Sequence, residues 1–168
     1  MNRISLLLMG LLAALQSSTS LGLPEDRLQP IQISADHAEL DDRKGVAIYT
    51  GDVRLVQGSL QITADLLTIR SDGKGVQSLT AIGKPAHYRQ QPRPDEPLTH
   101  GYGLRIEYSV ENNQVALINQ ARLERAADSF QGDKIIIDTA RDLVNATSAD
   151  NNGGQRVEMV IQPRTDSQ

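Results

Sequence analysis

The sequence predicts an all-β, elongated protein built from stacked short strands, and three observations support this fold class. Apolar and polar residues alternate over runs such as Ile31–Ser34 and Leu104–Tyr108, which is the periodicity of a strand with one buried face. Clusters of Gly, Asn and Asp separate the runs and supply the positive φ angles that hairpin turns need. Helical spacing at i, i+3 and i+4 is nowhere sustained.

The first residues have the features of a secretory signal peptide rather than of this fold. Arg3 supplies a positive charge, an apolar run extends from Ile4 to Leu15, and small residues follow it. A membrane anchor needs about 20 apolar residues, so the run is too short to be one. We expect residues 1–22 to form a cleavable signal peptide, cut near Ser20 or Gly22, and the mature chain to be exported.

The strands are expected to follow one another in a single domain over residues 23–168. The alternation is carried by Ile31, Ile33, Val53, Leu55, Leu60, Ile62, Leu104, Ile106, Tyr108, Ile135, Ile137, Val157, Met159 and Ile161. Turn clusters lie at 41–45, 71–75, 111–113 and 150–154. Three prolines mark residues 91–99 as an inserted loop, because each removes a backbone donor. A disordered tail is expected from about residue 164.

A weak internal repeat organises these strands. Ser34–Asp36, Thr63–Asp65 and Gln131–Asp133 each begin a unit that continues with a strand, a turn and a second strand. Two strands in each unit of about 30 residues, stacked along one axis, describe a β-solenoid or an elongated jelly-roll.

The stretch AIGKPAHYRQ (81–90) contains residues that interrupt a strand, and this interruption predicts where the strands bend. Gly83 and Pro85 are poor strand residues, and proline lacks the N–H of a ladder hydrogen bond. Such residues fit a corner or an open seam between two sheets. Two sheets closed along one side and splayed along the other would form a trough lined by aliphatic side chains.

The composition restricts the interior and excludes several classes of function. The chain is 39% hydrophobic but only 3% aromatic, so Ile, Leu and Val must build the interior. A net charge of −4 provides no general attraction for nucleic acid. The absence of cysteine excludes disulfides, thiol catalysis and thiolate metal sites.

No catalytic residue, metal site or cofactor is expected. His37, His87 and His100 are far apart in the sequence without metal-ligand spacing, and we expect those in strands to face solvent. Asp41–Asp42 lies in a predicted turn, where a solvated role is more common than acid–base chemistry. Five basic residues could face phosphate at a rim or could simply keep a β surface soluble: Arg43, Lys44, Lys74, Lys84 and Arg89.

Several short segments together resemble the LptA/OstA-like family of periplasmic lipopolysaccharide-transport proteins. They are Pro30–Ile33, Tyr49–Val53, Gln57–Gly58, Thr63–Asp65, Gly83–Tyr88, Gly132–Ile135 and Arg156–Val157. Each motif is weak alone, but their order and spacing are specific. The likeness extends over the chain from about Pro30 to Pro163.

The resemblance implies a V-shaped β-jellyroll with an open hydrophobic groove that shelters the acyl chains of lipopolysaccharide. It also implies a head-to-tail homo-oligomer that bridges the periplasm between an LptC-like partner at the inner membrane and an LptD-like partner at the outer membrane. No nucleic-acid partner is expected.

We expect fifteen inward-facing residues to line the groove or the core. They are Ile31, Ile33, Ile48, Leu55, Ile62, Leu67, Ile69, Leu104, Ile106, Tyr108, Leu117, Leu123, Phe130, Ile135 and Ile137. The edges for end-to-end pairing would be Ile31, Gln32, Ile33, Val157, Glu158, Met159 and Ile161. Proline at Gln32 or Glu158 should reduce self-association and leave the fold intact.

Other classes of function remain open at this point. A structural or adhesive β-solenoid would self-associate without binding lipid. A polysaccharide lyase would need carboxylates or basic groups clustered along one strand face, and the sequence has no such cluster. A membrane-anchored, LptC-like member of the same system would lack the cleavable signal.

Overall fold

The structure is a computed structural model that describes residues 25–148 and 156–163. The expected signal peptide at 1–22, the turn cluster at 150–154 and the expected tail from 164 lie outside the described residues. The described part of the chain holds no helix with the length and hydrophobicity to cross a bilayer.

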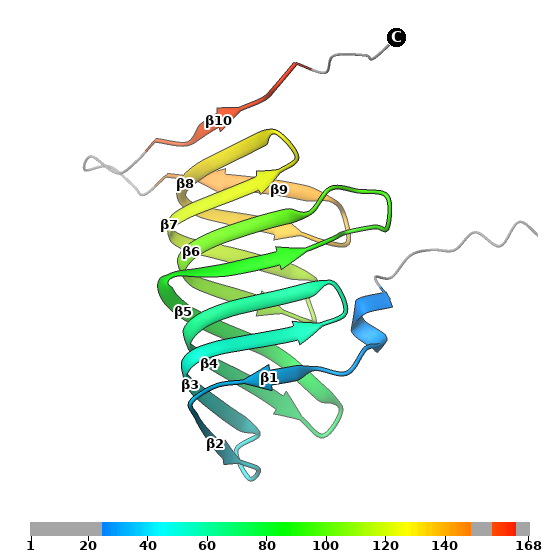
Figure 1. Ribbon diagram of the computed structural model, residues 1–168, viewed down its shortest axis with the longest axis vertical. Coiled ribbons are helices and arrows are strands. Elements are labelled where there is room, and N and C mark those ends of the chain that lie inside the picture. Colours follow the sequence, from blue (N-terminus) through cyan, green and yellow to red (C-terminus); the bar gives the residue numbers. More distant parts are fainter. Residues whose placement is uncertain (1–24, 149–155, 164–168) are drawn as a thin grey trace, which may run out of the picture.

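One antiparallel sheet accounts for nearly all of the described chain (Figure 1). A short 3-10 helix, η1 (Glu25–Leu28), precedes it. The strands are β1 (Gln32–Ser34), β2 (His37–Asp41), β3 (Val46–Gln57), β4 (Leu60–Asp72), β5 (Gly75–Gln90), β6 (Thr99–Ser109), β7 (Gln114–Arg125), β8 (Asp128–Asp138), β9 (Leu143–Thr147) and β10 (Glu158–Val160). The predicted all-β class and the hairpin order are confirmed.

The sheet folds back on itself along a line that crosses the middle of every long strand. The pairing register shifts between Thr50 and Val53 in β3, and similar irregularities follow in β4 to β8. Because each interruption lies opposite the next, they form one continuous bend, on the left of Figure 1. We call this bend the corner line.

The corner line divides the sheet into two walls. The β1 wall consists of residues 32–34, 53–57, 60–63, 86–90, 99–102, 121–125, 128–132 and 158–160. The β2 wall consists of residues 37–41, 46–50, 66–72, 75–82, 105–109, 114–118, 134–138 and 143–147. The hairpin turns of both walls lie on the side away from the corner line, which we call the open side (Figure 1).

The faulted stretch 81–90 lies where the sequence predicts it, at the corner. The register of β5 with β6 shifts between Ile82 and Ala86, a segment that contains Gly83 and the cis bond between Lys84 and Pro85. At the same level of β7, Asn119 and Gln120 have φ angles of 60° and 55°. Left-handed residues and bulges bend a strand, so they allow each strand to pass from one wall to the other.

The walls enclose an aliphatic core and the sheet does not close into a barrel. Core side chains come from both walls, among them Leu55 and Leu123 from one and Leu67 and Ile135 from the other. The terminal strands β1, β2, β9 and β10 each pair on one side only, within the described residues. The result is an open, V-shaped jellyroll, as predicted.

Candidate functional site

The space between the walls is the candidate site, and most of the predicted inward residues lie in it. Nine are buried in the core: Leu55, Ile62, Leu67, Ile69, Ile106, Leu117, Leu123, Ile135 and Ile137. Three more are partly buried against it: Ile33, Tyr108 and Phe130. Their inward orientation is therefore confirmed, whereas contact with lipid stays a prediction.

Three of the predicted inward residues do not pack into this core. Ile48 lies between Ala47, which is buried, and Tyr49, which packs against the core, so alternation places Ile48 on the outer face. Leu104 lies in the irregularity between Tyr102 and Arg105, where the corner interrupts the alternation. Both predictions were wrong, because three apolar residues in a row or a bulge hides which face a side chain takes.

Ile31 is the third residue, and it lies just before β1 with 37% of its surface exposed. It therefore belongs to the end of the molecule rather than to the core. The other predicted edge residues lie in or beside the terminal strands: β1 holds Gln32 and Ile33, and β10 holds Glu158 and Met159. The alternation did not identify β2 and β9 as the edges of the second wall.

Seven core residues were missed by sequence reasoning. They are Ala47, Leu79, Ala81, Ala86, Tyr88, Val115 and Ala121. Leu79 and Ala81 alternate with Ser78 and Thr80, a signal that could have identified them. The alanines carry too little apolar surface to stand out in the sequence.

The two walls are in close contact at Gly101. A Cβ atom placed on Gly101 would lie 3.0 Å from both methyl carbons of Leu117, which belongs to the opposite wall. Tyr88 pairs with Gly101 across β5 and β6, and its ring would lie 3.2 Å from the same atom. A side chain at this position would crowd Leu117 and Tyr88, so the protein's own side chains fill this part of the interior. Leu67, Ala81, Ile106 and Leu117 are each 0% exposed.

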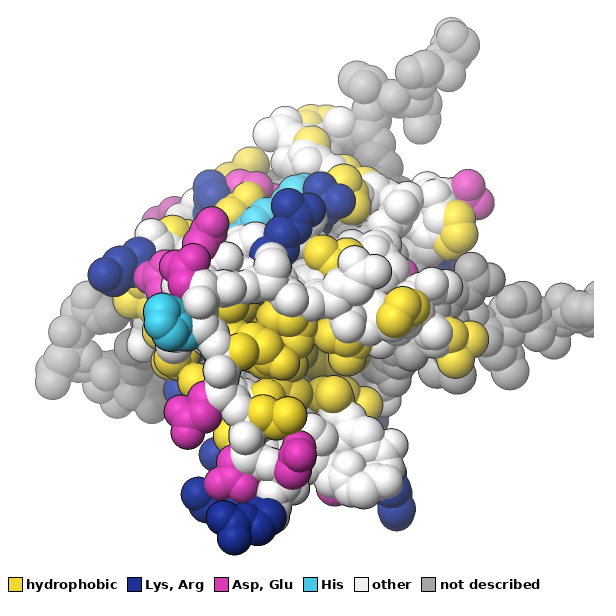
Figure 2. Space-filling model, turned by 60° about the horizontal axis from the view of Figure 1, so that its bottom comes forward, with side chains coloured by type: hydrophobic (Ala, Val, Ile, Leu, Met, Phe, Trp, Pro, Cys, Tyr) yellow, Lys and Arg dark blue, Asp and Glu magenta, His cyan; other side chains and the backbone are white. Residues whose placement is uncertain are grey.

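The ends of the molecule differ from this packed middle. At the end formed by β1 and β2, hydrophobic side chains gather between the walls and charged side chains surround them (Figure 2). Leu40 in β2 is 68% exposed, and Tyr49, which pairs with Ala38 of the same strand, is only partly buried. At the other end, Met159 is 54% exposed and Ile161 is 65% exposed. Apolar surface between the walls is therefore accessible at both ends.

A group of hydrogen bonds centred on Asp26, which we call the Asp26 bracket, stabilises the open side near the end formed by β1 and β2. The Asp26 carboxylate of η1 accepts hydrogen bonds from the Ser59 backbone N–H at 2.7 Å, the Ser59 hydroxyl at 2.6 Å and the Gln90 amide at 2.9 Å. The phenol of Tyr88 donates to the Gln90 side chain at 2.6 Å. Burial raises the pKa of Tyr88, so this buried phenol remains a neutral donor. Helix η1 thereby ties the β3–β4 turn to the end of β5.

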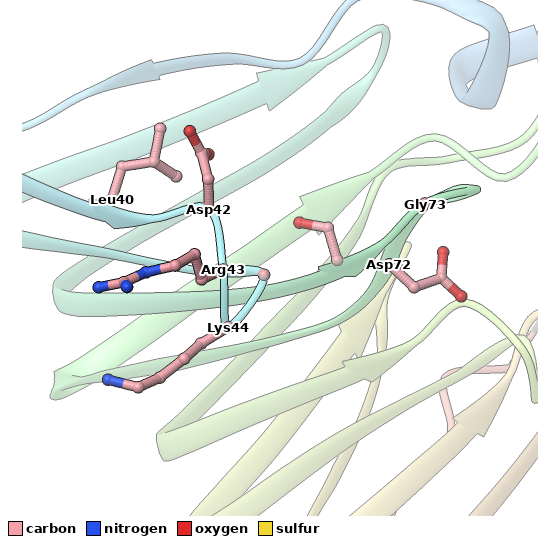
Figure 3. A pocket seen from close by; sticks show the side chains of 8 residues that line it. Leu40, Asp42, Arg43, Lys44, Asp72 and Gly73 are labelled. Carbon is pink, nitrogen blue, oxygen red and sulfur yellow. The ribbon is translucent and has the colours of Figure 1, made fainter.

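A cavity of about 420 Å³ lies outside this interior, between the β2–β3 and β4–β5 turns (Figure 3). Its walls are Leu40, Asp42, Arg43, Lys44, Gly45, Ser71, Asp72 and Gly73. Lys44 lies 2.9 Å from Asp41, and the hydrogen bond from its side chain lowers the pKa of Asp41. This open, polar cavity offers little apolar surface, so the aliphatic interior is the better candidate site for an apolar ligand.

The five basic residues considered as a rim do not lie together. Arg43, Lys44 and Lys74 lie at the β2–β3 and β4–β5 turns of the open side, whereas Lys84 lies at the corner and Arg89 on the outer face of the β1 wall. A continuous cationic rim made of these residues is therefore excluded.

The expectation that the strand histidines simply face solvent holds for His37, which is exposed in β2, but not for the other two. His87 and His100 are half-buried, and His87 Nε2 lies 3.0 Å from His100 Nδ1. They meet because Arg89 pairs with His100 and His87 pairs with Tyr102 across β5 and β6, a register that their separation in the sequence hides. Within residues 25–148 and 156–163, no group of three or more His, Cys, Asp or Glu side chains could hold a metal ion.

Comparison with protein families places this architecture among known proteins. Residues 32–142 match the family described as "LptA/(LptD N-terminal domain) LPS transport protein". The chain is 47% identical over 169 residues to a Pseudomonas aeruginosa protein named lipopolysaccharide export system protein LptH, with 96% of this chain and 95% of that protein covered. It is 30% identical over 167 residues to lipopolysaccharide export system protein LptA of Escherichia coli K12, covering 96% and 87%.

A solved structure has the same fold. The crystal structure of LptH from Pseudomonas aeruginosa, described as the LptA homologous periplasmic component of the lipopolysaccharide transport device, matches with a TM-score of 0.77 and 46% identity. The match covers 83% of this chain and all of that one.

Proposed function

Since the chain belongs to the LptA/(LptD N-terminal domain) family of LPS transport proteins, we propose that it carries lipopolysaccharide across the periplasm with the acyl chains held between its two walls. The family is one of transport proteins and not of enzymes. The observation that supports this mode of binding is the aliphatic interior of a sheet that is bent along one side and unpaired at both ends.

Burial of methylene groups supplies the free energy of this binding. Each acyl methylene removed from water contributes about 0.8 kcal/mol. The branched aliphatic side chains on the two walls are chemically similar to the acyl chains themselves. A phosphorylated headgroup can stay in water on the open side, so a chain of net charge −4 needs no deep cationic pocket to carry an anionic lipid.

The packed middle requires that lipid enters where the walls already separate. Interior side chains such as Ile106 and Leu117 are 0% exposed, whereas Ile33 and Phe130 near the two ends are only partly buried. An acyl chain would first cover the apolar surface at an end and would then part the walls about the corner line.

The transport route requires neighbours on both sides. We propose that copies of this chain assemble head to tail and that LptC-like and LptD-like proteins bind the terminal copies. The single-sided pairing of β1 and β10 and the exposed apolar residues beside them, such as Met159 and Ile161, support this arrangement. Export to the periplasm by a cleavable signal in residues 1–22 belongs to the same proposal.

The exposed ends also favour one other function. A structural β-protein could use the same edges to polymerise without taking lipid. Delipidated protein that still polymerises, but takes up no lipopolysaccharide, would favour this function over transport.

Site-specific photo-crosslinking tests the lipid site. A photoreactive amino acid at Ile33, which packs against the interior, should form an adduct with lipopolysaccharide, because an acyl chain at the first end would contact it. The same amino acid at Leu104 is the matched control, since Leu104 lies at the corner outside the core. Equal yields at the two positions, or none at Ile33, would count against lipid binding between the walls.

A further inference from the structure

The outer face of the β1 wall carries a row of stacked rings that the transport function does not use. Thr63, His87, Tyr102 and Arg122 are successive cross-strand neighbours on β4, β5, β6 and β7. The His87 and Tyr102 rings stack with centroids 4.6 Å apart, and the Arg122 guanidinium lies 4.4 Å from the centroid of Tyr102.

A second row runs beside the first on the same face, two residues nearer the hairpin ends of each strand. It contains Gln61, Arg89, His100 and Glu124. The two rows are joined by the contact of 3.0 Å between His87 Nε2 and His100 Nδ1. In this contact one nitrogen carries the proton and the other accepts the hydrogen bond, a geometry that both a neutral and a singly protonated pair can adopt.

Positive charge exceeds negative charge over these two rows, although the whole chain is acidic. Arg89 and Arg122 face the histidine pair from β5 and β7, and Glu124 is the only carboxylate in the two rows from β4 to β8. Glu124 already binds Arg122 at 2.9 Å. The groups that face the pair from β4, Gln61 and Thr63, are uncharged.

One further observation indicates that the cluster has unused capacity to bind an anion. The buried Nε atom of Arg89 has no hydrogen-bond partner among the described residues, which is costly for a guanidinium. The pKa of His87 is lowered mainly by burial, and the charges of His100 and Arg89 lower it further.

We propose that this cluster is a binding site for a phosphate monoester, with an affinity that rises when the histidine pair takes up a proton. Arg89 and Arg122 offer guanidinium N–H groups, and a protonated pair offers imidazole N–H groups from a second direction. A phosphate can accept from both directions with its three terminal oxygens, whereas a carboxylate has only two.

The location of the cluster suggests where the phosphate comes from. Arg89 immediately precedes Gln90, the last residue of β5, and His100 immediately follows Thr99, the first residue of β6. One residue of strand spans about 3.4 Å, so the cluster lies close to the open side. A lipid headgroup that leaves the interior over this wall would reach it, a source that rests on the proposed function. A soluble phosphate would reach it equally well.

Imidazole NMR of the whole folded protein tests the site without involving the acyl chains. The probes are inorganic phosphate, deacylated lipopolysaccharide and, for comparison, acetate at equal concentration. We expect phosphate to raise the pKa of His87 and to bind more tightly at pH 5.5 than at pH 7.5. Arg89→Gln should weaken phosphate binding about tenfold, because a charge-assisted hydrogen bond is lost.

Matched variants distinguish specific binding of phosphate at this cluster from a general effect of losing positive charge. Arg70→Gln removes a cation from the outer face of the β2 wall and should leave phosphate binding unchanged. Arg89→Lys keeps the charge, and retained binding in this variant would show that Arg89→Gln acts through charge and not through the fold. Joint replacement of His87 and His100 by Gln should remove the gain in binding at pH 5.5, leaving only the effect of the second ionisation of the phosphate itself, and should preserve binding at pH 7.5.

Each outcome decides the proposal. A response to phosphate and to deacylated lipopolysaccharide supports the site and identifies the headgroup as its source. A response to phosphate alone supports the site with a soluble ligand. No response, an equal response to acetate, or equal effects of Arg89→Gln and Arg70→Gln would overturn it. None of these results depends on whether acyl chains bind between the walls.

Discussion

The middle and the ends of the molecule are built from the same aliphatic side chains but differ in what covers them. In the middle, Leu117 of one wall packs onto Gly101 of the other, and neither side chain nor backbone leaves space between them. At the ends, Leu40 and Met159 keep more than half of their surface exposed. A single interior therefore combines a stabilising core with two accessible apolar ends.

This difference explains how a small protein can be both stable and able to bind lipid. The aliphatic residues of the middle contribute the burial that holds the two walls together. The ends contribute little to stability, and their apolar surface is available to an acyl chain or to another copy of the chain. The predictions below test this division, beginning with the largest expected effect.

Removing a side chain from the middle should cost far more stability than removing one from an end. Leu117→Ala should lower the free energy of unfolding by about 2–5 kcal/mol, because it leaves a cavity where the walls meet. Met159→Ala should change it by about 0.5 kcal/mol or less, since Met159 is already 54% exposed. Urea unfolding followed by circular dichroism measures both, and equal losses would show that the middle is no more tightly packed than the end.

Loss of the Asp26 bracket should have an intermediate effect. Asp26→Ala removes the acceptor of three hydrogen bonds and should destabilise the protein by about 1–3 kcal/mol. Hydrogen exchange should speed up first at the Ser59 backbone N–H, which loses its partner. Asp95→Ala, in the exposed loop after β5, is the control and should change neither property. Unchanged exchange at Ser59 would mean that η1 does not support the open side.

Proline in a terminal strand should weaken assembly more than folding. Gln32→Pro or Glu158→Pro removes one backbone hydrogen-bond donor from an edge strand. The association constant of the oligomer should fall about tenfold, because the free energy of roughly one hydrogen bond is lost. Light scattering over a range of concentrations measures the mass. Gln32→Ala and Glu158→Ala keep the N–H and should associate like the unaltered chain. If the mass of the oligomer is unchanged in both proline variants, β1 and β10 do not form the interface between copies.

Acid should produce the smallest effect, through the outer face of the β1 wall. The pKa of His87 is lower in the folded protein than its ordinary value of 6.5, so the unfolded chain takes up this proton first. Stability should therefore fall slightly as the pH drops below about 6.5. Thermal unfolding at pH 7.5 and pH 5.5 should show a smaller acid loss in His87→Gln than in the unaltered chain, and His37→Gln serves as the exposed control. If His87→Gln loses as much stability in acid as the unaltered chain, other titratable groups cause the loss.

The fold was largely predictable from the sequence because strand periodicity and turn chemistry are local signals. The alternation of Leu55 with Arg54 and of Ile135 with Lys134 identified the buried face in both walls. Gly83 and Pro85 predicted the corner because they are also local signals, whose backbone properties do not depend on distant residues. The wrong assignments, Ile48 and Leu104, lie where the local pattern is ambiguous or interrupted.

The features that local signals could not predict depend on register between strands. The contact of His87 with His100 and the fit of Leu117 against Gly101 join residues of different strands or walls. Packing of the middle depends equally on the distance between the walls, which the alternation does not contain. The sequence identified the inner face, and the structure was needed to show how closely the two inner faces meet.

The distance between the walls tests the central claim most directly. Because the chain contains no cysteine, Ala127→Cys in the β7–β8 turn and Ala140→Cys in the β8–β9 turn place one spin label on the open side of each wall. Pulsed electron paramagnetic resonance then measures the label separation with and without lipopolysaccharide. Acyl chains between the walls should lengthen this distance, whereas bound lipid that leaves it unchanged would contradict the account.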